Sequence, residues 1–163
     1  MVPPEKVGAG LLLLHGGECL LLLRSAKSGN PCTWGLPGGN AEPGEDASLL
    51  ETARREASEE CGPVPPFTVQ HEVLTRRGKH GQKHYTVFIA TTPARWQPTL
   101  NHEHTEFRWV PLPFVRLCAS ASDGACAMLP PGVSLLPLHP VVTAALAAAA
   151  EPLEAAAAAS LKA

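Results

Sequence analysis

Three glutamates in one short segment have the spacing of a divalent cation site. Glu56, Glu59 and Glu60 are spaced i, i+3 and i+4, so on a helix they fall within a sector of roughly 100°. Carboxylates this close repel one another unless a cation lies among them. Hard divalent cations prefer oxygen ligands, which favours Mg²⁺ or Mn²⁺. Alternatively, the glutamates form a solvated helix face with ion pairs to Arg55.

A helix from Leu49 to Cys61 is expected to position these glutamates. Ser48 is a candidate N-cap, with Glu51 three residues later as in a capping box, and Gly62-Pro63 is a strong stop signal. The apolar stripe that should face a sheet consists of Leu50, Ala53, Ala57 and Cys61. The glutamates lie beside this stripe, at the edge of the predicted core.

The segment from Gly39 to Gly62 resembles the signature of the Nudix hydrolase family. It joins the Gly38-Gly39 pair to Arg55-Glu56, Glu59-Glu60 and Gly62, and the preceding Trp34-Gly35-Leu36-Pro37 is also similar to the family. The resemblance covers about residues 7–150. It departs from the family at one point, because nine residues separate Glu45 from Arg55 where the family has seven. This two-residue insertion falls in the loop or the first helical turn.

The resemblance implies a role for each residue of the signature. Arg55 would orient the glutamates through a salt bridge. The family's first glutamate supports the helix and its arginine, and whether Glu45 still reaches Arg55 after the insertion is open. Glu51, one turn before Arg55, could substitute for it. The implied metal ligands are the backbone carbonyl of Gly38 and the carboxylates of Glu56, Glu59 and Glu60.

A further glutamate is the candidate general base. In the family this base is often a glutamate on a loop before the last strand, and Glu103 lies six residues before Trp109 in a segment similar to that region. We predict that Glu103 is the base or an additional metal ligand, with Glu106 as second choice and a plain loop glutamate as the alternative. The predicted catalytic group is therefore Arg55, Glu59 and Glu103.

Four other residues are candidates for substrate binding. Arg76 and Lys83 lie at a basic hairpin tip that could contact phosphate or remain solvated. Tyr85 could stack on a base, but strand alternation makes core packing an equal alternative. Trp34 could offer a stacking surface or belong to the core.

The order of elements predicts the fold class. Strands are expected at 7–14, 19–23, 67–76, 84–91 and 106–110, with a second helix over 140–150. Residues 111–137 are rich in proline, and we expect a loop with at most one short helical turn. The alanine-rich tail, 151–163, is either helical or frayed. We predict a single Nudix domain over residues 1–163, an α/β/α sandwich with a mixed central sheet flanked by helices.

Composition restricts the partners. The 163 residues are 45% hydrophobic and 17% charged, with a net charge of -2, so no basic field exists to capture nucleic acid. Five cysteines without a CxxC pair indicate neither a disulfide framework nor a zinc site, and favour a reducing cytoplasm. The apolar run Leu11 to Leu14 is too short to span a membrane. The oligomeric state is not readable from this sequence.

The resemblance implies an enzyme in which water splits a phosphoanhydride bond with the help of metal ions. The expected substrate is a nucleoside diphosphate linked to another moiety: an (oxidised) nucleoside triphosphate, a dinucleoside polyphosphate or a nucleotide sugar. One alternative is a nucleotide-binding or regulatory module with lost catalysis, and another is an RNA-decapping enzyme. The three helix glutamates and Arg55 favour catalysis, because a binding module has no need for a metal cluster.

Overall fold

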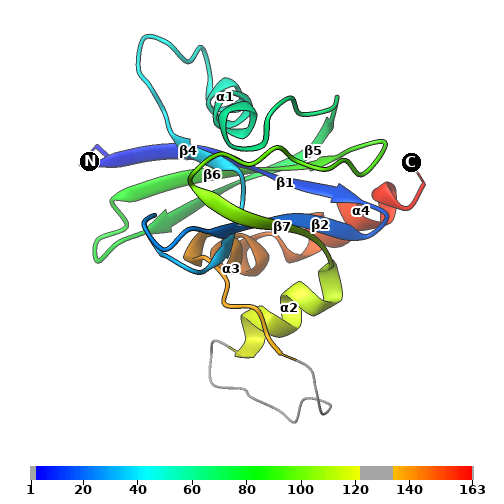
Figure 1. Cartoon of the computed structure of the whole chain (residues 1–163). Helices are drawn as coiled ribbons and strands as arrows, with labels where there is room; N and C mark the ends of the chain where they lie inside the picture. The colour runs from blue at the N-terminus through cyan, green and yellow to red at the C-terminus, as the bar shows by residue number, and fades with distance from the viewer. Residues whose placement is uncertain (1–2, 122–133, 163) are drawn as a thin grey trace.

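A mixed seven-stranded sheet forms the centre of the molecule (Figure 1). The computed structural model describes residues 3–121 and 134–162. The strands are β1 (Lys6–His15), β2 (Glu18–Arg24), β3 (Trp34–Gly35), β4 (Gly38–Asn40), β5 (Thr68–Arg77), β6 (Lys83–Thr91) and β7 (His104–Pro111). The central strand β1 pairs in parallel with β6 along one edge. On its other edge it pairs antiparallel with β4 near its start and with β2 near its end.

The remaining strands extend the sheet on both sides. β5 pairs antiparallel with β6, whereas β7 and the short β3 both pair antiparallel with β2. Residues 137–139 continue the sheet beyond β3, because Trp34 N–H donates to the Pro137 carbonyl and His139 N–H donates to the Trp34 carbonyl. This pairing brings the start of the C-terminal helices next to β3.

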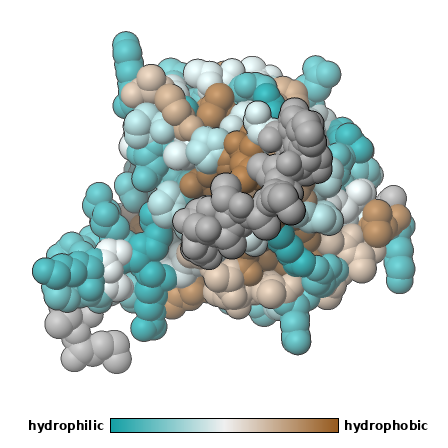
Figure 2. Space-filling model, turned by 90° about the horizontal axis from the view of Figure 1, so that it is seen from below, coloured by the Kyte–Doolittle hydropathy of each residue, from teal (hydrophilic) through white to brown (hydrophobic). Residues whose placement is uncertain are grey.

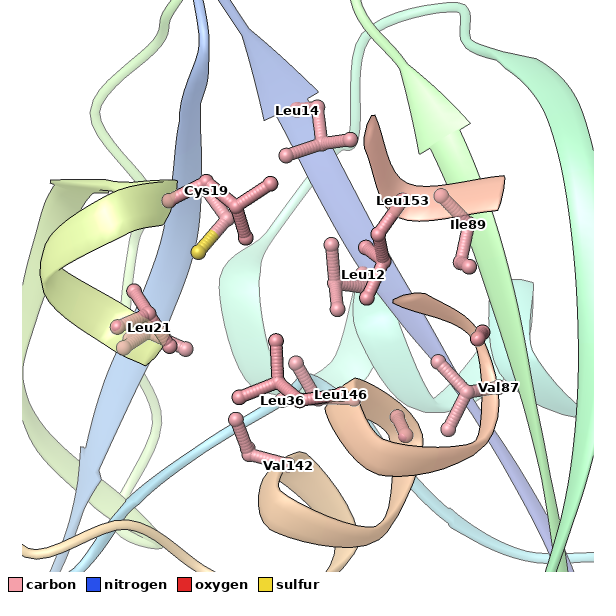
Figure 3. Packing of buried hydrophobic residues seen from close by; sticks show 14 of the residues in the cluster. Leu12, Leu14, Cys19, Leu21, Leu36, Val87, Ile89, Val142, Leu146 and Leu153 are labelled. Carbon is pink, nitrogen blue, oxygen red and sulfur yellow. The ribbon is translucent and has the colours of Figure 1, made fainter. Parts of the chain in front are cut away.

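Helices cover both faces of the sheet, which confirms the predicted α/β/α sandwich (Figure 1). On one face, Leu11 and Leu13 of β1 pack in a cluster with Ala53 and Ala57 of α1 (Leu49–Cys61). On the other face, alternate leucines of β1 and β2 pack against the helices α3 (Pro140–Ala148) and α4 (Ala150–Ser160) (Figure 3). A leucine run buried on both faces is what a central strand between two helical layers requires.

The helix α1 has the bounds that the sequence predicted. The Ser48 hydroxyl accepts a hydrogen bond from the Glu51 N–H at 3.2 Å, and Gly62 adopts a left-handed φ of 71° just after the helix. Ala53 and Ala57 are fully buried, so their small side chains let the helix lie close to the sheet. This close packing places the C-terminal half of α1 beside β4, which carries the glycine pair.

The prediction for residues 111–137 is wrong in its first part. Leu112–Ala121 forms a ten-residue helix, α2, rather than a loop with one turn. Its proline, Pro113, lies in the first turn, where the missing N–H costs nothing. Leu112, Val115 and Cys118 are buried at a helical spacing that the high proline content concealed. The rest of the predicted loop up to residue 133 lies outside the described residues.

The alanine-rich tail is helical and belongs to the core. Leu153 is fully buried in α4, and Ala156 and Ala157 pack in the same cluster, so the core extends past residue 150. Figure 2 views this helical side from below, with apolar surface visible between polar side chains. In the described residues, no single helix is long and apolar enough to span a membrane. The α3–α4 pair meets those criteria only when joined, and it is bent by 94°.

Ser160→Ala is expected to lower the free energy of unfolding by about 1 kcal/mol. The Ser160 hydroxyl, which is buried at the end of α4, accepts a hydrogen bond from the Gly17 N–H at 2.9 Å and ties the helix to the β1–β2 turn. Alanine leaves that N–H without its partner. Urea unfolding measures the change, and Ser120→Ala is the matched control because its hydroxyl is exposed. If both substitutions lower the free energy of unfolding equally, the Gly17–Ser160 hydrogen bond makes no specific contribution to stability.

Candidate functional site

A polar cavity of about 390 Å³ lies where the glycine pair of β4 meets the C-terminal half of α1. Carboxylates form one part of its lining and cationic side chains another. The lining residues that carry a charge or a polar ring are Arg24, Glu42, Glu56, Glu60, Arg77, Tyr85, Glu103 and His139. They come from β2, the loop between β4 and α1, α1, β5, β6, the loop before β7 and the N-cap of α3. The fold therefore gathers residues that are far apart in the sequence.

Glu60 is the most buried carboxylate of this cavity, with 3% of its surface exposed. Its Oε2 accepts a hydrogen bond from the Gly38 N–H at 3.0 Å. Burial, and then the nearby charges of Glu103 and Glu56, raise the pKa of Glu60 to about 9. Burial also raises the pKa of Glu56, against the opposing effect of Arg55. The acidic wall thus concentrates negative charge that solvent cannot stabilise.

The backbone around Gly38 leaves no room for a side chain, and a side chain on Gly39 would displace the Glu56 carboxyl. A Cβ on Gly39 would lie 2.5 Å from the carboxyl carbon of Glu56, and one on Gly38 would lie 2.5 Å from the Ala9 carbonyl oxygen. The Tyr85 hydroxyl fills the space beside Gly38 and beside Gly10 of β1. The floor of the cavity is therefore backbone, over which one phenol ring lies.

Arg55 holds the acidic segment together. It forms a bidentate pair with Asp46 at 2.9 and 3.0 Å, and also donates to Glu56 at 3.0 Å and to the Asn40 carbonyl at 3.0 Å. This guanidinium holds the pKa of Asp46 well below its ordinary range. A weaker contact reaches Glu59 at 3.4 Å. Arg55 consequently links the loop before α1 to the carboxylate that faces Gly39.

Neither Glu45 nor Glu51, the two candidate supports of Arg55, forms an ion pair with it in the described residues. The structure pairs Asp46, one residue after Glu45, with the guanidinium. Glu51 instead pairs with Arg54 at 3.6 Å. The two inserted residues lengthen the loop before α1. In this longer loop Asp46, rather than Glu45, is placed within reach of Arg55.

Comparison with known proteins places this site in a family. The sequence profile described as NUDIX domain matches residues 4–124. The chain belongs to the NUDIX domain family. No significant match is found among curated proteins. The match confirms the family that the glycine pair and the Arg55–Gly62 segment predicted, and the chain is a Nudix hydrolase.

Several solved structures are similar to this Nudix hydrolase. A Nudix hydrolase from M. smegmatis, RenU, is 29% identical with a TM-score of 0.62, and 88% of each chain is covered. The MutT NUDIX hydrolase from Burkholderia pseudomallei is 22% identical with a TM-score of 0.57, covering 94% of this chain and 98% of that chain. An Ap4A hydrolase from C. elegans, in a binary complex, is 24% identical with a TM-score of 0.56, covering 74% and 88%. For the two structures that are less than 25% identical to this chain, the similarity shows a shared fold and nothing more.

The structure of this Nudix hydrolase brings some of the predicted site residues together. Glu56, Glu60, Glu103 and Tyr85 line the cavity with the Gly38–Gly39 pair. Glu59 does not, since its side chain is 57% exposed and faces Arg55. Glu106, the second choice for the base, also lies outside the lining and pairs with Arg108. The metal and catalytic roles of all these residues stay predictions.

Three of the predicted substrate contacts lie elsewhere. Trp34 is 3% exposed and belongs to the core, with the guanidinium of Arg108 4.9 Å from its ring. Arg76 lines a different surface hollow together with His80 and His84. Lys83 does not line the cavity either. For this cavity the alternatives apply: Trp34 belongs to the core, and Arg76 and Lys83 lie outside the lining.

Arg24, Arg77 and His139 also line the cavity. The sequence places Arg77 in the basic hairpin tip that could contact phosphate, but gives no signal for Arg24 or His139. Strand alternation could have found Arg77, because neighbouring residues of a strand point to opposite faces and only one of Arg76 and Arg77 can face the site. His139 N-caps α3 by accepting from the Val141 N–H at 3.0 Å. Burial and then the charge of Arg24 lower the pKa of His139 to about 4, so it is neutral at pH 7.

The acidic wall has the chemistry of a hard-cation site. Within the described ranges, no three carboxylate, imidazole or thiol side chains are already gathered around one point for a metal ion. Arg55 draws Glu56 toward itself, and Gly38 holds one oxygen of Glu60. Glu60 forms no ion pair in the described residues, and burial beside Glu103 and Glu56 raises its pKa to about 9. A divalent cation with oxygen ligands would supply a counter-charge, so the donor set fits Mg²⁺ or Mn²⁺.

Proposed function

We propose that this Nudix hydrolase catalyses the Mg²⁺-dependent hydrolysis of a phosphoanhydride bond in a nucleoside diphosphate linked to another moiety. The observation that carries the proposal is the acidic wall: Glu56, Glu60 and Glu103 lie in one cavity, and Glu60 is so poorly solvated that its pKa rises to about 9. A wall of this kind favours a cation over a bare anionic substrate. With a cation bound, the same cavity becomes attractive to a phosphate chain.

The residues would divide the work as follows. The proposed metal ligands from the cavity wall are the carboxylates of Glu56 and Glu60 and the Gly38 carbonyl. Glu59 is also proposed as a metal ligand, on the family resemblance alone. Arg55 is a positioning residue, because its bond to the Glu56 carboxylate fixes that side chain opposite Gly39. When bound, Mg²⁺ would neutralise the phosphate oxygens and acidify the attacking water.

Glu103 is the proposed general base. It lies on the loop before β7, lines the same cavity, and its backbone N–H donates to the Asn101 side chain at 3.0 Å, which holds the loop. Its carboxylate would take one proton from water as the water oxygen attacks phosphorus. The P–O bond of the anhydride then breaks, and the leaving phosphate departs with the bridging oxygen. A carboxylate within reach of that water is what this step requires.

The proposed site and the similar structures together suggest which phosphoanhydride compounds to test as substrates. An Ap4A hydrolase is among the structures with this fold, and nucleoside triphosphates, dinucleoside polyphosphates and nucleotide sugars all contain the required bond. Oxidised nucleoside triphosphates, ADP-ribose and capped RNA complete the panel. If the wild type hydrolyses no compound of this panel, the protein is better explained as a nucleotide-binding module without catalysis. If it hydrolyses capped RNA alone, it is better explained as a decapping enzyme.

Purified protein with Mg²⁺ is expected to release a nucleoside monophosphate or diphosphate from at least one member of this panel. Removal of Mg²⁺ by EDTA should abolish the release, and Glu56→Gln should reduce kcat/KM by at least about 10²-fold, because metal ligation is worth several kcal/mol. Glu51→Gln is the matched control, since Glu51 lies on the same helix and pairs outward with Arg54. Wild-type turnover by Glu56→Gln and Glu59→Gln would refute the site.

A further inference from the structure

Two arginines in the cavity have no carboxylate partner among the described residues. Arg24 and Arg77 line the cavity, and neither forms an ion pair in the ranges 3–121 and 134–162. Ion pairs are formed there by Arg54, Arg55, Arg95, Arg108 and Arg116. Arg24 and Arg77 therefore lack the direct ion pair that most arginines of this protein form.

Arg77 gives the stronger indication of an anion site, because part of its guanidinium is buried. Its Nε has no hydrogen-bond partner in the described part of the chain. Burial lowers its pKa below the ordinary range, which means that the surroundings disfavour the charged form. A buried charge without a partner is costly to the fold. An anion from a ligand would supply both the missing charge and the missing hydrogen-bond acceptor.

Both arginines and the carboxylates of Glu56 and Glu60 act on the same phenol, Tyr85. Burial raises the pKa of the Tyr85 hydroxyl, Glu60 and Glu56 raise it further, and Arg77 and Arg24 oppose the shift. The histidines near the arginines add no charge at neutral pH, since burial and Arg24 hold the pKa of both His104 and His139 at about 4. The cavity therefore combines carboxylates suited to a cation with guanidinium groups suited to an anion.

We propose that Arg24 and Arg77 bind a further phosphate of the substrate. The cavity would then select chains of three or more phosphates, as in nucleoside triphosphates and dinucleoside polyphosphates, over the two phosphates of a nucleotide sugar. The inference rests on the proposed function, because the cleaved bond is taken to lie at the acidic wall. Guanidinium groups suit this role, since their planar N–H donors match phosphate oxygens.

Binding of two inorganic probes tests the inference without turnover. Calorimetric titration in saturating Mg²⁺ compares pyrophosphate with tripolyphosphate, which differ by one phosphate. The wild type is expected to bind tripolyphosphate about 10-fold tighter, as one charge-assisted contact supports. Arg77→Gln and Arg24→Gln should each remove most of this preference. Arg76→Gln is the matched control, because Arg76 is the neighbouring residue of β5 but lines another hollow.

The outcomes separate this inference from the hydrolase proposal. An unchanged preference in both Arg77→Gln and Arg24→Gln, or an equal loss in Arg76→Gln, overturns the phosphate site even if the enzyme turns over nucleotides. A preference that depends on Arg77, in a protein that hydrolyses nothing, supports the phosphate site and defeats the proposed function. Should Arg77→Gln not fold, Arg77→Lys keeps the charge but not the planar donors, and partial preference is then the expected result.

Discussion

Glu60→Gln is expected to lower kcat/KM about 10³-fold and at the same time to raise the melting temperature of the metal-free protein at pH 8. The activity is lost because a neutral amide is a poor ligand for a hard cation. Stability increases because Glu60 is almost fully buried beside the carboxyls of Glu56 and Glu103. A glutamine oxygen can still accept the Gly38 N–H, so this hydrogen bond of the side chain is kept.

The pH dependence of this effect has a defined sign. In the folded, metal-free protein, the pKa of Glu60 is about 9, whereas in the unfolded chain it is near its ordinary value of 4.5. Between these values the folded state binds more protons than the unfolded state. The stabilisation is therefore complete below about pH 4.5 and is lost as the pH rises toward 9. Glutamine at this position does not titrate, so the free energy of unfolding of the variant should depend less steeply on pH.

Melting curves of wild type and Glu60→Gln at pH 5.5, 7 and 8.5, with and without Mg²⁺, measure both effects. Mg²⁺ should raise the melting temperature of the wild type most at the highest pH, where ionised Glu60 needs a counter-charge. The variant should respond much less. Glu72→Gln is the control, since Glu72 lies on the exposed strand β5. Equal Mg²⁺ stabilisation of wild type and Glu60→Gln would show that the cation binds elsewhere.

Arg55→Ala is expected to reduce kcat/KM about 10²-fold, because charge-assisted hydrogen bonds of this kind contribute roughly 1.5–3 kcal/mol each. Without Arg55, the Glu56 carboxylate loses the interaction that counteracts its burial, and its pKa should rise further. Activity of the variant should then require a higher pH than that of the wild type. The pH profile of kcat/KM measures this shift, which loss of folded protein alone would not produce.

The partner of Arg55 gives the matched comparison. Asp46→Asn removes the charge of the bidentate pair and should reproduce part of the Arg55→Ala defect. Glu45→Gln changes the preceding residue, which forms no ion pair with Arg55 in the described residues, and should behave as wild type. The reverse order, with Glu45→Gln impaired and Asp46→Asn normal, would mean that the loop before α1 adopts another arrangement in the active enzyme.

The sequence predicts the site best where local signals and chemistry coincide. Ser48, Gly62 and the alanine stripe define α1 without tertiary information, and the glutamate spacing predicts where its charges lie. Asp46 could not be predicted, because the loop conformation decides which acidic residue meets Arg55. The contrast between Arg76 and Arg77 depends on the register of one strand, where a shift by one residue reverses the facing side. Helix α2 was not predicted because the proline-rich segment around it obscures a buried stripe that only packing makes evident.

The backbone floor of the cavity has a consequence for how this enzyme could acquire new substrates. Gly38 and Gly10 approach backbone carbonyl oxygens so closely that a side chain there would force the backbone to shift, whereas a side chain on Gly39 would meet the Glu56 carboxyl. Substitution at Gly38 and Gly10 therefore cannot gradually reshape the surface next to the acidic wall, whereas the other walls are formed by the side chains of Arg24, Arg77 and His139. Chemistry and selectivity consequently rest on different kinds of structure, one fixed and one evolvable. Divergence of this lineage should accumulate on the side walls while the floor persists.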